Sequence, residues 1–228
     1  MPNNAVIIVA GGSGKRFGSK VPKQFLMLAG LPVFIRSVLA YKRTNLFSKI
    51  VLVAPAGRLK QLAGFSKQYG FDLVAGGKER SDSVRNGLKA LPADIAIVAI
   101  HDAARPLITK DVIVRAMESA AKYGAAVASV PARDTVKLAN GGKVLKTIPR
   151  TAVWLAQTPQ VFKKAVIDKA YKKLGRAKVT DDAQAAEKAG YRVYVTLGDY
   201  DNIKITDKRD FDIALNLISN KQSLISNK

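Results

Sequence analysis

The residues that could perform chemistry gather first near the start of the chain. There an apolar run, Val6–Ala10, passes into a loop of small residues and cations, Gly11–Arg16, and Pro22–Gln24 follows closely. Small residues let backbone N–H groups approach a ligand, and a loop after a strand can cradle phosphate oxygens. Lysine and arginine beside such a loop can hold the more highly charged phosphates. The segment therefore predicts a triphosphate site.

Two commoner phosphate-binding motifs do not fit this loop. A Walker A loop requires glycine at the position of Val9 and Ser or Thr at the position of Arg16. The dinucleotide fingerprint requires a third glycine where Phe17 stands, and no acidic residue follows about twenty positions later to hold a ribose. The remaining alternative is a flexible surface turn, which the preceding strand and the following cations disfavour.

The composition restricts the class of protein. A chain of 228 residues with 48% hydrophobic content can form one sizeable α/β domain or two small ones, and it is not expected to be disordered. Because there is no cysteine, disulfides, thiolate nucleophiles and cysteine-based zinc sites are excluded. The start of the chain lacks the charged region of a signal peptide, and no apolar run approaches the roughly 18 residues that span a bilayer. We therefore expect a cytoplasmic protein without a membrane partner.

The net charge of +21 raises the question of nucleic-acid binding. The basic residues are spread along the chain, and the densest cluster, Lys163–Lys178, has the pattern of a solvated helix face and its following loop. Zinc-finger spacing, an aromatic RNA-binding signature and a basic tail are missing from the sequence. We therefore favour an enzyme with polyanionic substrates over a nucleic-acid-binding protein.

Strand and helix patterns alternate along the chain, which predicts an α/β fold with a mostly parallel sheet and helices on both of its faces. The expected strands are Ala5–Ala10, Ile50–Pro55, Phe71–Ala75, Ile95–His101, Ala125–Val130 and Arg192–Leu197. The expected helices are Val33–Tyr41, Gly57–Tyr69, Ser81–Leu91, Lys110–Tyr123, Lys163–Leu174, Asp181–Ala189 (capped by Thr180) and Asp207 to about Ile218. Ligands of such sheets bind beyond the carboxyl ends of the strands, where the glycine loop and His101-Asp102 stand.

One stretch interrupts this alternation. Between Asp134 and Arg150, two strand-like runs flank Asn140-Gly141-Gly142, which has the chemistry of a hairpin turn. The runs are too polar at alternate positions for a central sheet. We therefore expect a β-hairpin arm at about residues 133–152 that projects from the body, either as a lid or as an arm around another subunit.

Further motifs follow the first loop in order: Gly76–Val84, His101–Pro106, Arg133–Thr135, Thr158–Gln160, Thr180–Ala183 and Asp201–Thr206. The whole set resembles the 2-C-methyl-D-erythritol 4-phosphate cytidylyltransferases of the non-mevalonate isoprenoid pathway, from about Val6 to Leu217. Many sugar-nucleotide transferases share a glycine-rich loop, but His-Asp-Ala-Ala-Arg-Pro with Thr-Pro-Gln and Asn-Ile-Lys-Ile-Thr is far more specific. The resemblance implies a single Rossmann-like nucleotidyltransferase domain over residues 1–228.

The resemblance also implies a reaction. A phosphate oxygen of the sugar-alcohol phosphate attacks the α-phosphorus of CTP, pyrophosphate leaves, and Mg²⁺ or another divalent cation assists. Such a transfer needs in-line positioning and neutralisation of charge more than covalent help from the protein. A site rich in Arg and Lys with one carboxylate for the metal suits this need.

Individual roles follow from the same resemblance. Arg16 and Lys23 would stabilise the charge on the α-phosphate and pyrophosphate, and Lys204 would orient the acceptor phosphate. Thr135 and Arg150 would reach that phosphate in the other subunit of a homodimer. The implied set is Arg16, Lys23, Arg150 and Lys204 for catalysis; Ala10, Gly11, Gly12, Gly14, Gly76, Gly77, Ser83 and Ala103 for the nucleotide; Arg105, Thr135 and Thr158 for the acceptor substrate; and Asp102 for the metal.

Several alternatives stay open on sequence alone. Ser83 could read cytosine or simply cap a helix, and Arg105 could reach a phosphate or pair with an acidic neighbour. A structural place at the end of its strand is favoured for His101 over proton transfer. The sister family of ribitol-5-phosphate cytidylyltransferases has the same layout with Val in place of Ala104, so the sequence favours methylerythritol phosphate as the acceptor.

Overall fold

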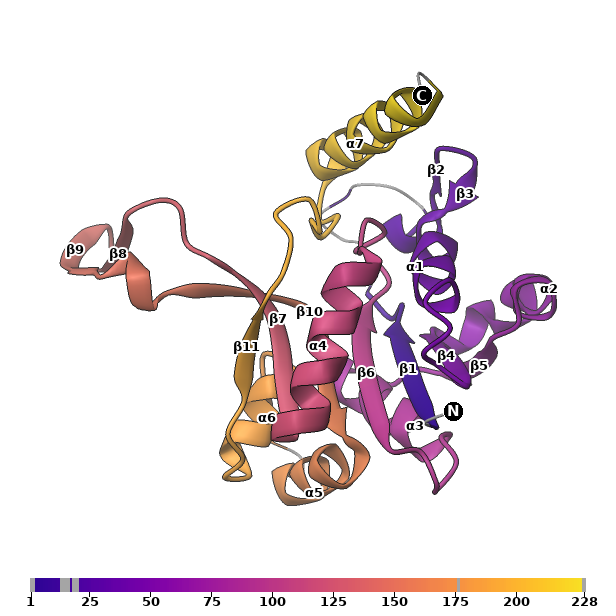
Figure 1. Ribbon diagram of the computed structural model, residues 1–228, viewed down its shortest axis with the longest axis horizontal. Coiled ribbons are helices and arrows are strands. Elements are labelled where there is room, and N and C mark those ends of the chain that lie inside the picture. Colours follow the sequence, from indigo (N-terminus) through magenta and orange to yellow (C-terminus); the bar gives the residue numbers. More distant parts are fainter. Residues whose placement is uncertain (1–2, 13–16, 18–20, 176, 227–228) are drawn as a thin grey trace.

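The computed structural model describes residues 3–12, 17, 21–175 and 177–226 (Figure 1). Their centre is a seven-stranded sheet in the order β11-β7-β10-β6-β1-β4-β5. All neighbouring pairs are parallel except those of β10, which is antiparallel to both β6 and β7. The strands are β1 (Asn4–Val9), β4 (Lys49–Ala54), β5 (Asp72–Ala75), β6 (Ile97–Asp102), β7 (Ala125–Pro131), β10 (Trp154–Lys163) and β11 (Tyr194–Leu197).

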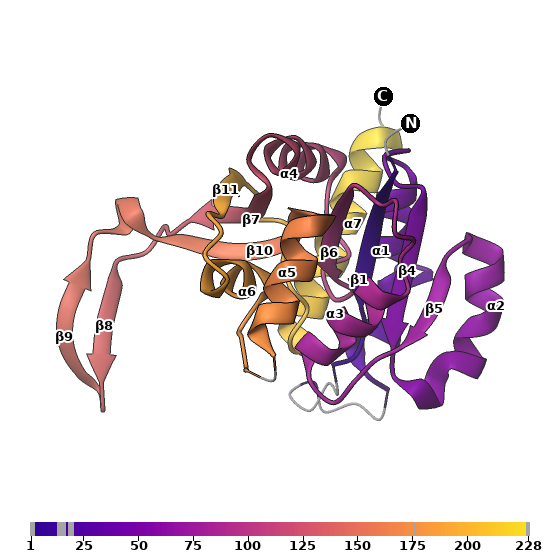
Figure 2. The ribbon, with the colours of Figure 1, turned by 90° about the horizontal axis from the view of Figure 1, so that it is seen from below.

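Helices cover both faces of the sheet (Figures 1 and 2). One face packs against α1 (Val33–Lys42), α2 (Leu59–Tyr69) and α4 (Lys110–Tyr123), and the other against α3 (Arg80–Lys89), α5 (Lys164–Leu174) and α6 (Asp182–Lys188). Successive side chains of a strand point to opposite faces, so Val6 and Ile8 join the first core while Ala5 and Ile7 join the second. The predicted α/β fold with a mostly parallel sheet is confirmed.

A third, smaller core lies beside the main body. It joins α7 (Lys208–Ser226) to the short pair β2 (Met27–Leu28) and β3 (Leu31–Pro32) through Ala214, Ile218 and Leu28. The last helix therefore runs well past the predicted end at Ile218. This packing places the segment before α7, which carries Lys204, next to the sheet.

Strand β10 is the one strand of the sheet that the sequence patterns did not predict. Its run contains Pro159, which cannot donate to a ladder and usually indicates an edge or a break. The pairing with β7 is interrupted between Ala156 and Gln160, and proline falls inside this irregularity. The strand thus inserts between β6 and β7 and brings Thr158 beside the end of β6.

The predicted hairpin is confirmed as β8 (Val136–Asn140) and β9 (Lys143–Ile148), which form a two-stranded sheet of their own. Gly141 and Gly142 have φ of +53° and +79°, the left-handed pair that a tight hairpin turn with two central residues requires. The arm projects away from the body (Figures 1 and 2). Its side chains are largely exposed, including Leu138, Val144 and Leu145.

Two smaller predictions have different outcomes. Thr180 does not cap α6, because Asp181 is the N-cap and its carboxylate accepts the backbone N–H of Gln184 at 2.9 Å. The basic cluster does lie on a solvated helix face, since Lys169, Lys172 and Lys173 of α5 are exposed. Within the described part of the chain, no helix is long and apolar enough to cross a membrane.

Candidate active site

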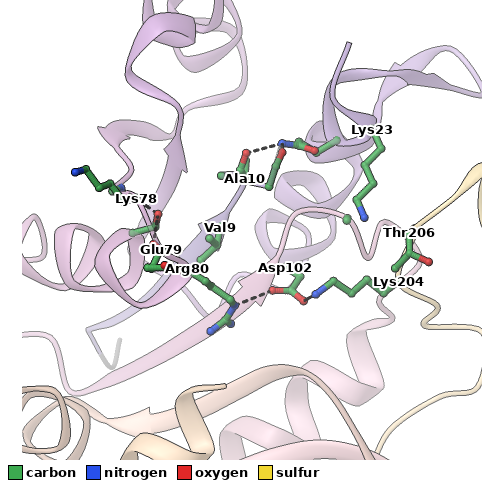
Figure 3. A pocket seen from close by; sticks show the side chains of 15 residues that line it. Val9, Ala10, Lys23, Lys78, Glu79, Arg80, Asp102, Lys204 and Thr206 are labelled. Atoms are coloured by element: carbon green, nitrogen blue, oxygen red, sulfur yellow. Dashed lines mark hydrogen bonds and ion pairs between the residues drawn. The ribbon is translucent and has the colours of Figure 1, made fainter. Parts of the chain in front are cut away.

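A cavity of about 410 Å³ opens at the carboxyl ends of β1 and β6 (Figure 3). These neighbouring strands end at Val9 and Asp102, which are register partners. From its carboxyl end β1 leads on to β4 on one side, whereas β6 leads on to β7 on the other, so the connections diverge at this point. Open α/β sheets bind ligands at such a point.

Asp102 lies between two cations of the cavity wall (Figure 3). Its Oδ2 is 2.7 Å from Nζ of Lys204, and its Oδ1 is 3.3 Å from Nε of Arg80. Burial alone would raise the pKa of Asp102, but the positive charges of Arg80 and Lys204 outweigh it and hold the pKa well below its usual range. The carboxylate is therefore ionised at neutral pH.

The cavity wall carries more positive than negative charge. Figure 3 shows the Lys23 side chain extending into the cavity from the side opposite Lys78. Such a lining suits a polyphosphate ligand. The described lining residues are Val9, Ala10, Gly11, Gly12, Lys23, Gln24, Gly77, Lys78, Glu79, Arg80, Ser83, Asp102, Ala104, Lys204 and Thr206.

The glycine loop after β1 is held by Gln24, whose side chain is almost fully buried. Its Nε2 donates to the carbonyl groups of Ala10 at 2.7 Å and Gly12 at 2.9 Å. Both carbonyls are thereby occupied, while the main chain of Gly11 and Gly12 is exposed at the cavity. The sequence presented Gln24 only as the neighbour of Lys23, because no local pattern shows which carbonyls an amide will reach.

The turn before α3 forms another wall of the cavity. The Ser83 hydroxyl accepts the N–H of Gly77 at 3.1 Å and donates to the carbonyl of Glu79 at 3.2 Å. A Cβ on Gly77 would lie 2.3 Å from Cβ of Asp82, so the turn requires glycine there. The N-cap of α3 is Glu79, and Ser83 lies inside the helix. Ser83 is therefore not the helix cap; its hydroxyl shapes the turn.

Comparison with known proteins decides the family. The profile described as 2-C-methyl-D-erythritol 4-phosphate cytidylyltransferase matches residues 4–220 of the chain. The chain belongs to this family. The cytidylyltransferase of that name from Endomicrobium trichonymphae is 46% identical over 212 residues, which cover 92% of this chain and 96% of the relative.

Solved cytidylyltransferase structures share the fold. The crystal structure of 4-diphosphocytidyl-2C-methyl-D-erythritol synthase from Anaerococcus prevotii is similar with a TM-score of 0.84 at 29% identity, covering 95% of this chain and 98% of that one. The 2-C-methyl-D-erythritol 4-phosphate cytidylyltransferase from Thermus thermophilus gives 0.80 at 30% identity, with the same two coverages. The family resemblance carried by the sequence motifs is thereby confirmed.

The fold brings many of the predicted site residues of this cytidylyltransferase together. Ala10, Gly11, Gly12, Lys23, Gly77, Ser83, Asp102 and Lys204 all line the cavity. Gly76 and Ala103 lie directly behind the cavity. The backbone N–H of Gly76 donates to the carbonyl of Ala54 at 2.8 Å, and that of Ala103 donates to the carbonyl of Val9 at 3.0 Å. The predictions for Gly14 and Arg16 fall outside the described residues.

Arg105 and Thr158, predicted to contact the acceptor, are packed beside Asp102 and do not line the cavity. Nη1 of Arg105 donates to the carbonyl of Asn202 at 2.7 Å, and its Nε is 4.0 Å from Oδ2 of Asp102. Burial lowers the pKa of the Arg105 guanidinium. The Thr158 hydroxyl accepts the backbone N–H of Asp102 at 3.1 Å. Both residues thus support the strand end that carries Asp102.

Thr135 and Arg150 lie at the base of the arm, and neither lines the cavity of its own chain. Both are exposed, and Nη1 of Arg150 donates to the carbonyl of Arg133 at 2.7 Å. The guanidinium of Arg133 in turn stacks on the ring of Tyr200, 3.3 Å from its centroid. If Thr135 and Arg150 serve a site, it is therefore not the cavity described for their own chain.

Arg80 is the main cavity residue to which sequence reasoning gave no role, although its motif was recognised. Its Nη2 is 2.7 Å from Oδ2 of the fully buried Asp182, while its Nε faces Asp102. The Tyr171 hydroxyl donates to the other oxygen of Asp182 at 2.5 Å. Although burial would lower the pKa of Arg80, the charges of Asp182 and Asp102 raise it. Arg80 therefore keeps its charge and links the cavity to a buried carboxylate from α6.

Proposed function

We propose that this cavity is the place where CTP and 2-C-methyl-D-erythritol 4-phosphate react, with Asp102 as the residue that organises it. In the family's reaction the acceptor phosphate oxygen forms a bond to the α-phosphorus of CTP while the bond to pyrophosphate breaks. The observation that carries the proposal is the ionised Asp102 between Lys204 and Arg80 at the end of β6.

The nucleotide fits the side of the cavity formed by the first loop. Gly11 and Gly12 leave their main chain accessible there, and Lys23 reaches in from the 3-10 helix Lys23–Phe25. A cation at this place would stabilise negative charge on the α-phosphate and on departing pyrophosphate. Arg16, by family resemblance, would add to it, and the Gly77 turn would receive the base.

A divalent cation fits Asp102. Mg²⁺ prefers oxygen ligands, and it is often held by one or two carboxylates together with substrate phosphates and waters. Among the described residues no cluster of three or more His, Cys, Asp or Glu side chains could hold a metal by itself. One ionised carboxylate in a cavity for a triphosphate meets the need of a metal that the substrate helps to bind. When bound, Mg²⁺ would neutralise phosphate charge.

Lys204 fits the role of orienting the acceptor phosphate. Its side chain is partly exposed at the cavity, and its ammonium group is paired with Asp102. A phosphate dianion that binds between Lys204 and the nucleotide would be held by the Lys204 ammonium group close to the α-phosphorus. A cytoplasmic location also stays a prediction, whereas the family match supports methylerythritol phosphate over ribitol phosphate as the acceptor.

We also propose that the arm belongs to a homodimer. A two-stranded hairpin alone is marginal in water, and this one exposes Leu138, Val144 and Leu145. Apolar side chains are exposed on the body too, at Leu155 and along β11, where Val195 and Leu197 are about half exposed. A twofold partner could cover both sets. Thr135 and Arg150 would then complete the partner's site.

The test is an assay of pyrophosphate release with CTP, Mg²⁺ and either 2-C-methyl-D-erythritol 4-phosphate or ribitol 5-phosphate. We expect release with the first acceptor, loss of it in EDTA, and much poorer use of ATP, GTP and UTP. Omitting the acceptor controls for CTP hydrolysis. Faster release with ribitol 5-phosphate would contradict the acceptor, and full activity in EDTA would contradict the metal.

A further inference from the structure

His101, at the end of β6, makes two hydrogen bonds although its ring is fully buried. Its Nε2 is 3.1 Å from the carbonyl oxygen of Arg105, and its Nδ1 is 3.0 Å from the hydroxyl oxygen of Thr158. The Tyr41 ring and the imidazole pack edge to face, with centroids 5.1 Å apart. The ring is thus confined on several sides, and it has no place in the lining of the cavity.

The chemistry of the partners determines which nitrogen carries hydrogen. A carbonyl oxygen only accepts, so Nε2 must be the donor to Arg105. In a neutral ring Nδ1 is then an acceptor, and the Thr158 hydroxyl donates to it. The Thr158 oxygen is left free to accept the backbone N–H of Asp102, which it does at 3.1 Å.

These bonds join three parts of the chain around Asp102. The turn after β6 is closed by the amide of Arg105, which donates to the carbonyl of Asp102 at 3.0 Å. The imidazole spans the same turn through its bond to the carbonyl of Arg105, and the hydroxyl of Thr158 ties the imidazole to β10. The main chain on both sides of Asp102 is therefore held, while Lys204 and Arg80 each pair with one oxygen of the carboxylate itself.

We propose that His101 and Thr158 form a positioning pair that holds Asp102 at its place in the active site. The pair acts through the main chain and touches neither substrate. Its effect on the reaction rests on the proposed function of Asp102. Loss of the Thr158 hydroxyl would leave the Asp102 amide and Nδ1 of His101 without their partner, so the carboxylate would shift from its place and the transfer would slow.

The first measurement is the tautomer of His101 by ¹⁵N NMR of the imidazole. His101 is the only histidine of the chain, so one set of ring signals is expected. In wild-type protein at pH 7 the signals should be those of the Nε2–H tautomer, and adding CTP should not change the tautomer. A ring protonated on Nδ1 alone, or a tautomer change on adding CTP, would overturn the proposal. This arm needs no variant and no activity.

The second measurement compares Thr158→Val with Thr158→Ser and with the matched control Thr44→Val. The Thr44 hydroxyl also accepts an amide, that of Leu46, and donates to a carbonyl, that of Tyr41, but it lies away from the cavity. We expect kcat to fall at least about 10-fold in Thr158→Val, with KM for CTP changing less than about 3-fold. Thr158→Ser should recover most of kcat, and Thr44→Val should keep it.

Two outcomes of this comparison are decisive. Equal kcat in Thr158→Val and Thr44→Val, with similar losses of Tm, would show that the hydroxyl is only structural and would overturn the proposal. If Thr158→Val does not fold, Thr158→Ser still decides, because it must retain both the ring signals and kcat. Wild-type protein that releases no pyrophosphate would contradict the proposed function, while the tautomer measurement would still test the pair.

Discussion

The ammonium group of Lys204 lies 2.7 Å from the carboxylate of Asp102, although the two residues come from the segment before α7 and the end of β6. The carboxylate of Asp102 pairs with both Lys204 and Arg80, so its negative charge is compensated within the protein. Polyphosphate and a divalent cation can take over those partners without leaving any of the charges alone. The arrangement therefore suits a site that exchanges one set of ionic contacts for another.

Asp102→Asn should lower kcat/KM by about 10²–10³. The amide keeps the shape of the side chain but loses the negative charge that pairs with Lys204 and that the proposed metal would need. Pyrophosphate release at saturating acceptor measures the loss. Asp168→Asn is the control, since Asp168 is paired with Lys164 on the surface of α5. Equal activity of the two variants would contradict a role for the Asp102 charge.

Lys23→Ala should lower kcat by about 10²–10³ with a smaller change in KM, because the cation serves the charge that develops on the phosphates. Arg16→Ala should behave alike if the family resemblance holds. Steady-state kinetics with varied CTP separates the two constants. Lys169→Ala, at an exposed position of α5, removes the same charge elsewhere and should change little. Mild and equal effects at all positions would show that only the overall positive charge matters.

Arg80→Ala should lower the free energy of unfolding by about 1–3 kcal/mol, because it leaves the buried carboxylate of Asp182 with only Tyr171 as a side-chain partner. Urea unfolding at pH 7 measures this change in the free energy of unfolding, and because urea is uncharged it does not screen the ion pair. Lys49→Ala is the comparison, since its pair with Asp72 is partly exposed, and it should cost less than about 1 kcal/mol. Similar losses would mean that Asp182 finds another partner when Arg80 is removed.

Stability should fall as the pH is lowered through the range in which His101 is neutral when folded but protonated when unfolded. Its folded pKa is about 4 because of burial, against 6.5 for the free side chain. Between these values the unfolded chain binds the extra proton, so folding loses stability as pH falls from about 6.5 toward 4. The charged neighbours are Asp102, which favours protonation, and Arg105 and Lys204, which oppose it.

Urea midpoints measured in EDTA between pH 7 and pH 4.5 test this loss of stability, and His101→Asn should flatten the slope of stability against pH. An equal slope in that variant would assign the effect to other groups.

If the arm completes the partner's site, two inactive variants should restore activity when they form a heterodimer. Arg150→Ala and Arg16→Ala should each be nearly inactive as homodimers. Refolded together, they should form heterodimers with one intact site and recover part of the pyrophosphate release. Heterodimers that form but stay inactive would mean that Arg150 acts within its own chain, and a monomer in analytical ultracentrifugation would contradict the dimer itself.

The sequence by itself determined the features that depend on neighbouring residues. Apolar runs such as Val6–Ala10 predicted their strands, Asn140-Gly141-Gly142 predicted the turn of the arm, and the motifs predicted the family. These signals are local, because backbone preference and the alternation of buried positions are written in consecutive residues.

Only the tertiary structure decided which distant side chains meet. The insertion of β10 between β6 and β7 brings Thr158 to His101 and Asp102, and the packing of α6 on α5 brings Asp182 to Arg80 and Tyr171. Strand order and helix packing set these contacts through the whole core. No spacing along the chain encodes them, so the partners of Asp102 became visible only in the folded molecule.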